Sequence, residues 1–190
     1  MAKYALKEWS AVWEALATGR QSILLRKGGL AEAGEEFDVP ASQFWLFPTY
    51  THQQESALKH DAAIFLETAR AARPAQNRVR LTHSAELAGV YHVHELLAAI
   101  LLSHWHILSD HMVEERFAYQ RPGIYVLVLR VYRAPQIHEL IDMPSYAGCR
   151  SWVELDQDLP TEGGIPVLSD DEFSHLMTTL DRLLRPVGLA

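Results

Sequence analysis

The segment at residues 124–135, with the sequence IYVLVLRVYRAP, constrains the fold of this chain more than any other. Its near-continuous β-branched, leucine and aromatic residues are typical of a strand, and Pro122 and Gly123 before it are typical of a turn. A strand that lacks alternating polar residues has both faces covered in the folded protein. We therefore expect a central strand with packed layers on both sides.

Other segments predict the elements around this strand. Further strands are expected near residues 21, 44, 78, 151 and 165, where short apolar or alternating runs are bounded by turn residues. Helices are expected over residues 54–72 and 111–120, and a last helix after Ser169, which forms a capping box with Glu172. Residues 89–110 are expected to form a strand that runs into a helix.

The first segment has a helical pattern. Leu6, Trp9, Val12 and Leu16 recur at steps of three and four residues, which predicts one amphipathic helix over residues 4–18. Gly19 follows where a left-handed cap belongs, so we expect it to have a positive φ.

Length and composition predict one unit. A chain of 190 residues that is 48% hydrophobic can bury one substantial core, so we expect a single compact domain over residues 1–190, with a helical insertion at about 94–120. The longest apolar run, residues 96–102, is far shorter than the roughly 18 residues that span a membrane. No signal peptide is recognisable, and Cys149 has no cysteine to pair with. We therefore expect a cytoplasmic protein that does not bind a membrane.

Charge limits the function classes. The formal net charge of −7 opposes sequence-independent coating of nucleic acid, because such binding depends on lysine and arginine displacing counterions. The arginines are unevenly distributed, however, with four within residues 70–80 and three within residues 121–133. A local basic groove on an acidic body is therefore compatible with the sequence.

Two segments offer candidate ligand-binding residues. Arg26 and Lys27 end a predicted strand, where cationic groups can clamp a phosphate. The competing interpretation is a solvated basic hairpin tip, which suits Lys27 better, whereas Arg26 after an apolar run needs an anionic partner. The segment TYTHQ follows another strand, and its aromatic ring and amide can stack on a base and read its edge, unless it is an ordinary helix start with threonine caps. The candidate ligand-binding residues are Arg26, Lys27, Tyr50, His52, Gln53 and Arg130.

A histidine-rich segment raises the question of a metal. His104 and His106 are two residues apart, and His111 and Glu115 would share one face of a helix. These spacings can hold zinc or another divalent metal, which would be the cofactor of a hydrolase or nuclease. The competing interpretation is that the histidines are hydrogen-bonded packing residues, since none of the established metal motifs is present.

The stretch GRQSILLR, residues 19–26, resembles the opening motif of ASCH domains, a branch of the PUA-like β-barrels, written G-x-K-x-x-E-x-R. Gly19 and Arg26 match it, whereas Gln21 replaces the lysine and Leu24 the glutamate or threonine. The resemblance implies a cleft that binds RNA or modified nucleotides. It does not carry over the lysine-dependent hydrolysis found in some small members, because glutamine cannot act as a base or nucleophile.

A second resemblance extends over nearly the whole chain. Six segments agree in order with a prokaryotic family known as domain of unknown function 1802, namely ALKEW, LLRKGGLAE, FWLFPTYTHQ, HMVEERF, VLVLRVYRAP and GCRSWVEL. This resemblance implies membership of that family and no particular activity.

Together these observations predict an α+β fold, a PUA-like (ASCH-like) mixed β-barrel or sheet with helices packed outside. The leading functional hypothesis is a binding module for nucleic acid or a modified nucleotide. The alternatives are a metal-dependent hydrolase or nuclease that uses His104, His106, His111 and Glu115, and a protein-interaction domain. Whether the chain forms a homo-oligomer is left open.

Overall fold

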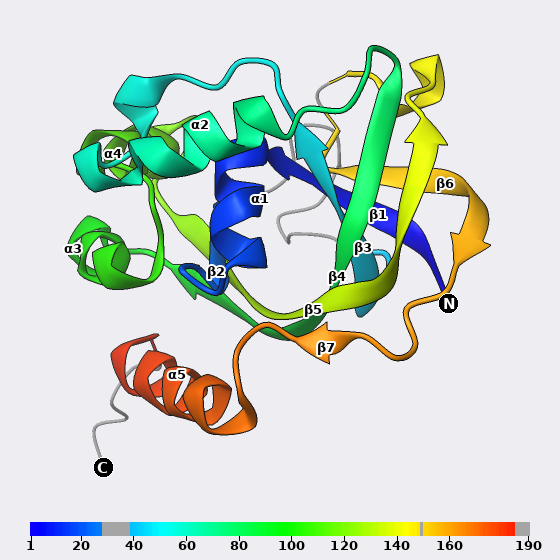
Figure 1. Ribbon diagram of the computed structural model, residues 1–190. Coiled ribbons are helices and arrows are strands. Elements are labelled where there is room, and N and C mark those ends of the chain that lie inside the picture. Colours follow the sequence, from blue (N-terminus) through cyan, green and yellow to red (C-terminus); the bar gives the residue numbers. More distant parts are fainter. Residues whose placement is uncertain (28–38, 149, 185–190) are drawn as a thin grey trace.

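The computed structural model describes residues 1–27, 39–148 and 150–184 (Figure 1). Cys149 lies outside the described residues. One sheet of seven strands has the order β2-β5-β4-β3-β1-β6, and β7 pairs with β5. The strands are β1 (Ala2–Trp9), β2 (Ile23–Arg26), β3 (Gln43–Thr49), β4 (Arg78–Val93), β5 (Ile124–Ile141), β6 (Trp152–Leu159) and β7 (Ile165–Pro166).

The α-helices gather on one side of the curved sheet, as Figure 1 shows, and all five contribute residues to one apolar cluster. The α-helices are α1 (Ser10–Ala17), α2 (Ala63–Ala71), α3 (Leu96–Leu101), α4 (Asp110–Ala118) and α5 (Asp170–Leu184). Four short 3-10 helices are η1 (Glu55–Ala57), η2 (His60–Ala62), η3 (Leu102–Trp105) and η4 (Pro144–Tyr146). The predicted class, an α+β protein with a mixed sheet and helices outside it, is confirmed, and within the described residues the sheet stays open between β2 and β6.

The strand β5 is central, as its composition predicts. It pairs with β2, β4 and β7, and residues 126–131 are buried without interruption. Beyond Val131 its residues are partly buried or exposed, and the strand continues as a long ribbon paired with β4. The segment 89–93 extends β4 and leads into α3, so the predicted strand-to-helix transition is confirmed.

The prediction of one helix over residues 4–18 is wrong for its first half. Residues 2–9 form β1, which pairs in parallel with β3 and antiparallel with β6, and only residues 10–17 are helical. Leu6 and Trp9 fit the spacing of a helix. Pairing of this segment with β3 on one edge and β6 on the other favours the extended conformation instead. A local sequence pattern does not reveal such pairing. Residues 54–72 likewise begin as the 3-10 turns η1 and η2, and only α2 is an α-helix.

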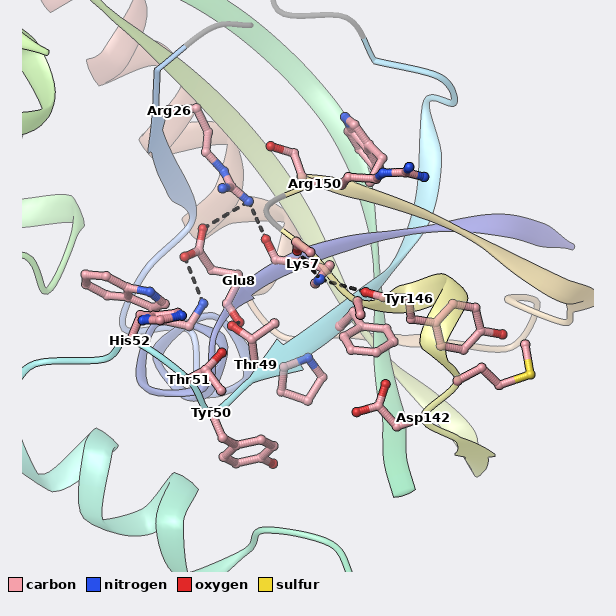
Figure 2. Close-up of a pocket in the computed structure, with 18 of the residues that line it drawn as sticks. Lys7, Glu8, Arg26, Thr49, Tyr50, Thr51, His52, Asp142, Tyr146 and Arg150 are labelled. Atoms are coloured by element: carbon pink, nitrogen blue, oxygen red, sulfur yellow. Dashed lines mark hydrogen bonds and ion pairs between the residues drawn. The ribbon is translucent and has the colours of Figure 1, made fainter. Parts of the chain in front are cut away.

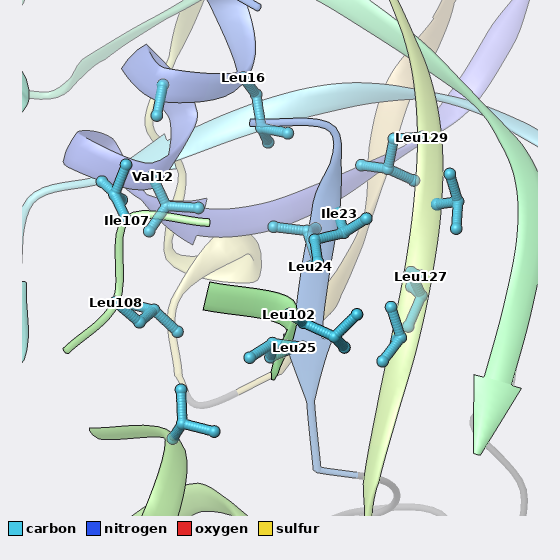
Figure 3. Packing of buried hydrophobic residues seen from close by; sticks show 14 of the residues in the cluster. Val12, Leu16, Ile23, Leu24, Leu25, Leu102, Ile107, Leu108, Leu127 and Leu129 are labelled. Atoms are coloured by element: carbon cyan, nitrogen blue, oxygen red, sulfur yellow. The ribbon is translucent and has the colours of Figure 1, made fainter. Parts of the chain in front are cut away.

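Both faces of the sheet are covered by apolar side chains. On β3, Phe44 and Leu46 join the larger cluster with the helices, whereas Trp45 and Phe47 join a smaller cluster on the opposite face with Tyr146. The larger cluster packs residues of α1, β2 and β5 together with Leu102, Ile107 and Leu108 from the segment that connects β4 to β5 (Figure 3). This segment contains α3, η3 and α4 and corresponds to the helical stretch expected at about 94–120.

Two local predictions are confirmed. Gly19 has φ 74°, which lets the chain turn from α1 into β2. At the start of α5, the Ser169 amide donates to Glu172 Oε2 at 2.8 Å and the Glu172 amide donates to Ser169 Oγ at 3.3 Å, which is the predicted capping box. No helix in the described ranges is both long and apolar enough to span a membrane.

Candidate functional site

A cleft of about 970 Å³ opens where β1 and β3 end side by side (Figure 2). Because these strands are parallel and pair Trp9 with Thr49, their carboxyl ends and the residues that follow share one edge of the sheet. The end of β2, residues 50–52, the segment 142–148 and the start of β6 complete the walls.

The lining of the cleft is basic. Among the described residues, two carboxylates, Glu8 and Asp142, face six cationic side chains, although the whole chain has a net charge of −7. The cationic residues are Lys7, Arg26, Lys27, Arg73, Arg116 and Arg150. Low-dielectric walls of one charge sign concentrate the field inside a cleft, so this cleft attracts anions.

Glu8 and Arg26 form an ion pair at the base of the cleft. Glu8 Oε2 lies 3.3 Å from an Nη atom of Arg26, and only 3% of the Glu8 side chain and 18% of the Arg26 side chain are exposed. Arg26 also donates to the Lys7 carbonyl, and Glu8 Oε1 accepts from the Trp9 amide at 2.9 Å. Arg26 therefore has the anionic partner that its burial requires, and this partner belongs to the chain itself.

A second arginine lies against this pair. Arg116 of α4 donates to the Leu25 carbonyl at 2.8 Å, and its guanidinium carbon lies 5.0 Å from the centre of the Trp9 ring. Burial lowers the pKa of Arg116, the Glu8 carboxylate opposes that shift, and the Arg26 charge adds to it. Arg116, Arg26 and Glu8 thus form one charged cluster, which we call the floor of the cleft.

The two lysines of the lining are held by carbonyl groups. Lys27 Nζ donates to the carbonyls of Phe117 at 3.0 Å and Gly123 at 2.8 Å and also to that of Arg121, and burial lowers its pKa. Lys7 Nζ donates to the carbonyls of Tyr146 and Gly148 at 2.7 and 2.9 Å. The Lys7 contacts hold the segment around η4 as a wall of the cleft, and the Lys27 contacts tie the end of β2 to the turn after α4.

The outer part of the cleft is aromatic and accessible. Tyr50 is half-buried, and the guanidinium of the exposed Arg73 lies 5.1 Å from its ring centre. His52 is exposed with φ 61°, and Arg150 is exposed at the opposite side (Figure 2). We call Tyr50, His52, Arg73 and Arg150 the rim of the cleft.

Two sequence-predicted ligand-binding residues lie elsewhere. Gln53 Oε1 accepts from the Ala11 amide at 3.0 Å, so its side chain serves the start of α1. Arg130 donates to the Ser169 carbonyl at 3.1 Å and to Asp170, and it stacks over Phe173. Neither residue lines the cleft, whereas Arg26, Lys27, Tyr50 and His52 all do.

The four residues proposed for a metal differ in their environments. His106 is fully buried and its Nδ1 accepts from the Leu108 amide at 3.2 Å, whereas His111 and Glu115 pair with each other at 3.3 Å on the exposed face of α4. His104 is exposed and packs edge-on against Trp105. Among the described residues, no group of three or more histidine, cysteine, aspartate or glutamate side chains is placed to hold a metal ion. Metal analysis of the purified protein would test this part of the hypothesis directly.

Sequence reasoning missed most of the floor. Glu8 and Lys7 were assigned to a helix, and Arg116 was treated as part of an ordinary helical segment. The resemblance to the 1802 family contained a signal for the lining of the cleft. Five of the six segments that resemble the family supply lining residues, and the segment in β5 does not. Arg116, Arg26 and Glu8 come from three of those segments.

A scan against protein-family models matches residues 5–179 to the family described as "Domain of unknown function (DUF1802)". The chain belongs to the DUF1802 family. The match includes every described residue that lines the cleft. No curated protein sequence matches this DUF1802 chain significantly.

Solved structures of an ASCH protein from Zymomonas mobilis also match. A serine-to-alanine mutant of that protein aligns with 12% identity and a TM-score of 0.46, covering 93% of this chain and 94% of its own. The structure described as ASCH from the same organism aligns with 14% identity and a TM-score of 0.45, covering 92% and 93% of the two chains. ASCH is the domain class that the GRQSILLR stretch resembles.

Proposed function

We propose that this DUF1802 protein is a binding module for single-stranded nucleic acid or a modified nucleotide, and that the cleft beside β1 and β3 is its binding site. The observation that carries the proposal is the accumulation of six cationic side chains in one cleft of an acidic chain. A structural role explains single buried cations, but it does not explain why the exposed Arg73 and Arg150 face the same cavity.

The rim supplies groups for both parts of a nucleotide. Arg73 and Arg150 can bind phosphate oxygens with charge-assisted hydrogen bonds, and the Tyr50 ring offers a face on which a base can stack. The Arg73 guanidinium lies over the Tyr50 ring, so a base that stacks on Tyr50 would lie close to this guanidinium. Binding of this kind tolerates different sequences, because every base has a π face.

Affinity measurements on rim variants test the proposal. We expect Arg150→Ala to weaken binding of a short single-stranded RNA by about 1–3 kcal/mol, which is the usual range for a lost charge-assisted hydrogen bond. Tyr50→Ala should weaken it by about 1–3 kcal/mol through lost stacking. Arg70→Ala is the matched control, since Arg70 is an exposed arginine of α2 outside the lining.

The salt dependence gives a second readout. Each phosphate contact removed should make the fall of affinity with salt concentration less steep, by about 0.7 in the logarithmic slope for single strands. Arg150→Ala should therefore lower the slope, and Tyr50→Ala should leave it unchanged. Equal affinities for wild type, Arg150→Ala and Tyr50→Ala would refute the assignment of the cleft, and an absence of binding by every protein would favour the protein-interaction alternative.

A further inference from the structure

The floor of the cleft contains more positive than negative charge among the residues that the structure describes. Arg26 and Arg116 share one buried carboxylate, Glu8, and the other carboxylate of the lining, Asp142, is exposed at the rim. Buried charges that lack a counter-charge are costly, because burial removes the water that would solvate them. In the described ranges, the two guanidiniums of the floor thus face one buried carboxylate, which leaves an excess of one positive charge.

The hydrogen bonding of the floor is also incomplete. Nε of Arg26 is buried and has no acceptor in the described part of the chain. Arg116 donates one hydrogen bond to a backbone carbonyl and places its face over Trp9, and a guanidinium has five N–H donors in all. Guanidinium donors and positive charge thus occur together in the floor, next to Glu8 Oε2, a buried oxygen that also lacks a hydrogen-bond partner in the described part of the chain.

We infer that the floor at Arg26 and Arg116 receives a terminal phosphate, so that the ligand is a nucleotide monophosphate or the phosphorylated end of a single strand. This inference rests on the proposed function. A phosphate monoester carries about −1.5 to −2 charge at pH 7 and three strong acceptor oxygens, whereas an internal phosphodiester carries one charge and two free oxygens. The three oxygens of the monoester can accept from both guanidiniums, and its second charge suits a lining in which, among the described residues, six cationic side chains face two carboxylates.

The position of the floor fits the terminal group of a nucleic-acid strand. Lys7 Nζ bonds to the segment around η4, which lines the cleft, and Arg26 donates to the Lys7 carbonyl, so this wall lies next to Arg26. Lys27, which follows Arg26, also lines the cleft and is held by the turn after α4. The burial that lowers the pKa of both Arg116 and Lys27 strengthens their attraction for an anion, because the effective dielectric constant is lower there. The base-stacking ring of Tyr50 and the exposed Arg150 remain at the rim for the nucleotides that follow.

Titration calorimetry on the wild-type protein tests the inference without labels. The probes are one eight-nucleotide single-stranded RNA in three forms, with a 5′-phosphate, with a 3′-phosphate and with hydroxyl groups at both ends, together with a nucleoside 5′-monophosphate and its nucleoside. We expect one phosphorylated form to bind at least tenfold more tightly than the hydroxyl form. This preference should shrink below about pH 6, where the monoester loses its second charge.

Variants locate the phosphate. Arg116→Gln should reduce the preference for the phosphorylated RNA about tenfold, whereas Arg150→Ala should weaken both forms and keep their ratio. If Arg116→Gln does not fold, the wild-type ratio and its pH dependence decide the question alone. Equal binding of all three RNA forms would overturn the inference and leave the proposed function standing. Absence of binding by every probe would overturn both.

Discussion

At the scale of single residues, the pair of Glu8 and Arg26 links the fold to the site. Arg26→Ala should lower the free energy of unfolding by about 3 kcal/mol, because it removes the ion pair of the buried Glu8 carboxylate and leaves only the Arg116 charge nearby. The double variant Arg26→Ala with Glu8→Gln should recover part of that loss, since glutamine is neutral and keeps an oxygen for the Trp9 amide. Urea denaturation of the two variants measures the difference. Equal stability of the single and double variants would show that the carboxylate is not what makes Arg26 necessary.

Gly19 supports a second residue-scale prediction. A Cβ at Gly19 would lie 2.9 Å from Leu168 Cδ2 and 3.2 Å from Val167 Cγ1, and the residue has φ +74°. Gly163 is a matched control, because its φ is +75° and its Cβ would meet only Pro135 Cγ at 3.9 Å. Both Gly→Ala changes should cost about 1–2 kcal/mol for the left-handed backbone, and Gly19→Ala should cost more through the contact with Leu168. Thermal melts that rank Gly163→Ala as the more damaging change would contradict this.

At the scale of elements, Arg130 attaches α5 to the sheet. Its side chain is 9% exposed and reaches the Ser169 carbonyl, Asp170 and the Phe173 ring. Arg130→Ala should therefore destabilise the protein by about 1.5–3 kcal/mol, the range for hydrogen bonds to charged groups, and should leave RNA affinity unchanged at a temperature where the variant is folded. Arg182→Ala, on the exposed face of α5, controls for the lost charge. If Arg130→Ala lowered the affinity for RNA without lowering the stability of the protein, Arg130 would be a ligand-binding residue after all.

The elements show which part of the fold a sequence can predict. Composition is sufficient to predict a strand such as β5, whose residues 126–131 are buried on both faces. The local sequence is sufficient to predict the cap formed by Ser169 and Glu172. Neither predicts β1, because its extended form depends on partners more than thirty residues away, such as Trp45 and Val153. The same limit hid the floor of the cleft, since Glu8, Arg26 and Arg116 meet only after the sheet and α4 are assembled.

At the scale of the whole molecule, two buried histidines make stability depend on pH. His83 contacts Thr82 and the edge of Trp13, and its pKa falls to about 4, mainly through burial and further through the Arg133 charge. The pKa of His106 falls to about 3, again chiefly through burial, with Lys59 among the charges that add to it. Both side chains are thus neutral in the folded protein over most of the acid range, whereas they take up protons near pH 6.5 once unfolded.

The direction of the effect follows from proton uptake. Below pH 6.5 the unfolded chain binds protons that the folded chain does not, so the stabilisation is complete above that pH and is lost as the pH falls toward about 4 for His83 and about 3 for His106. Each histidine should contribute up to about 1.4 kcal/mol per pH unit within its window. Urea denaturation between pH 7 and pH 4 should therefore show a falling free energy of unfolding.

Two variants test the role of His106. His106→Asn should make the fall of stability with pH less steep, and it keeps an acceptor for the Leu108 amide. His111→Asn, at an exposed position of α4, should leave the slope as in the wild type. Parallel profiles for all three proteins would mean that His106 is not the group that takes up the proton on unfolding.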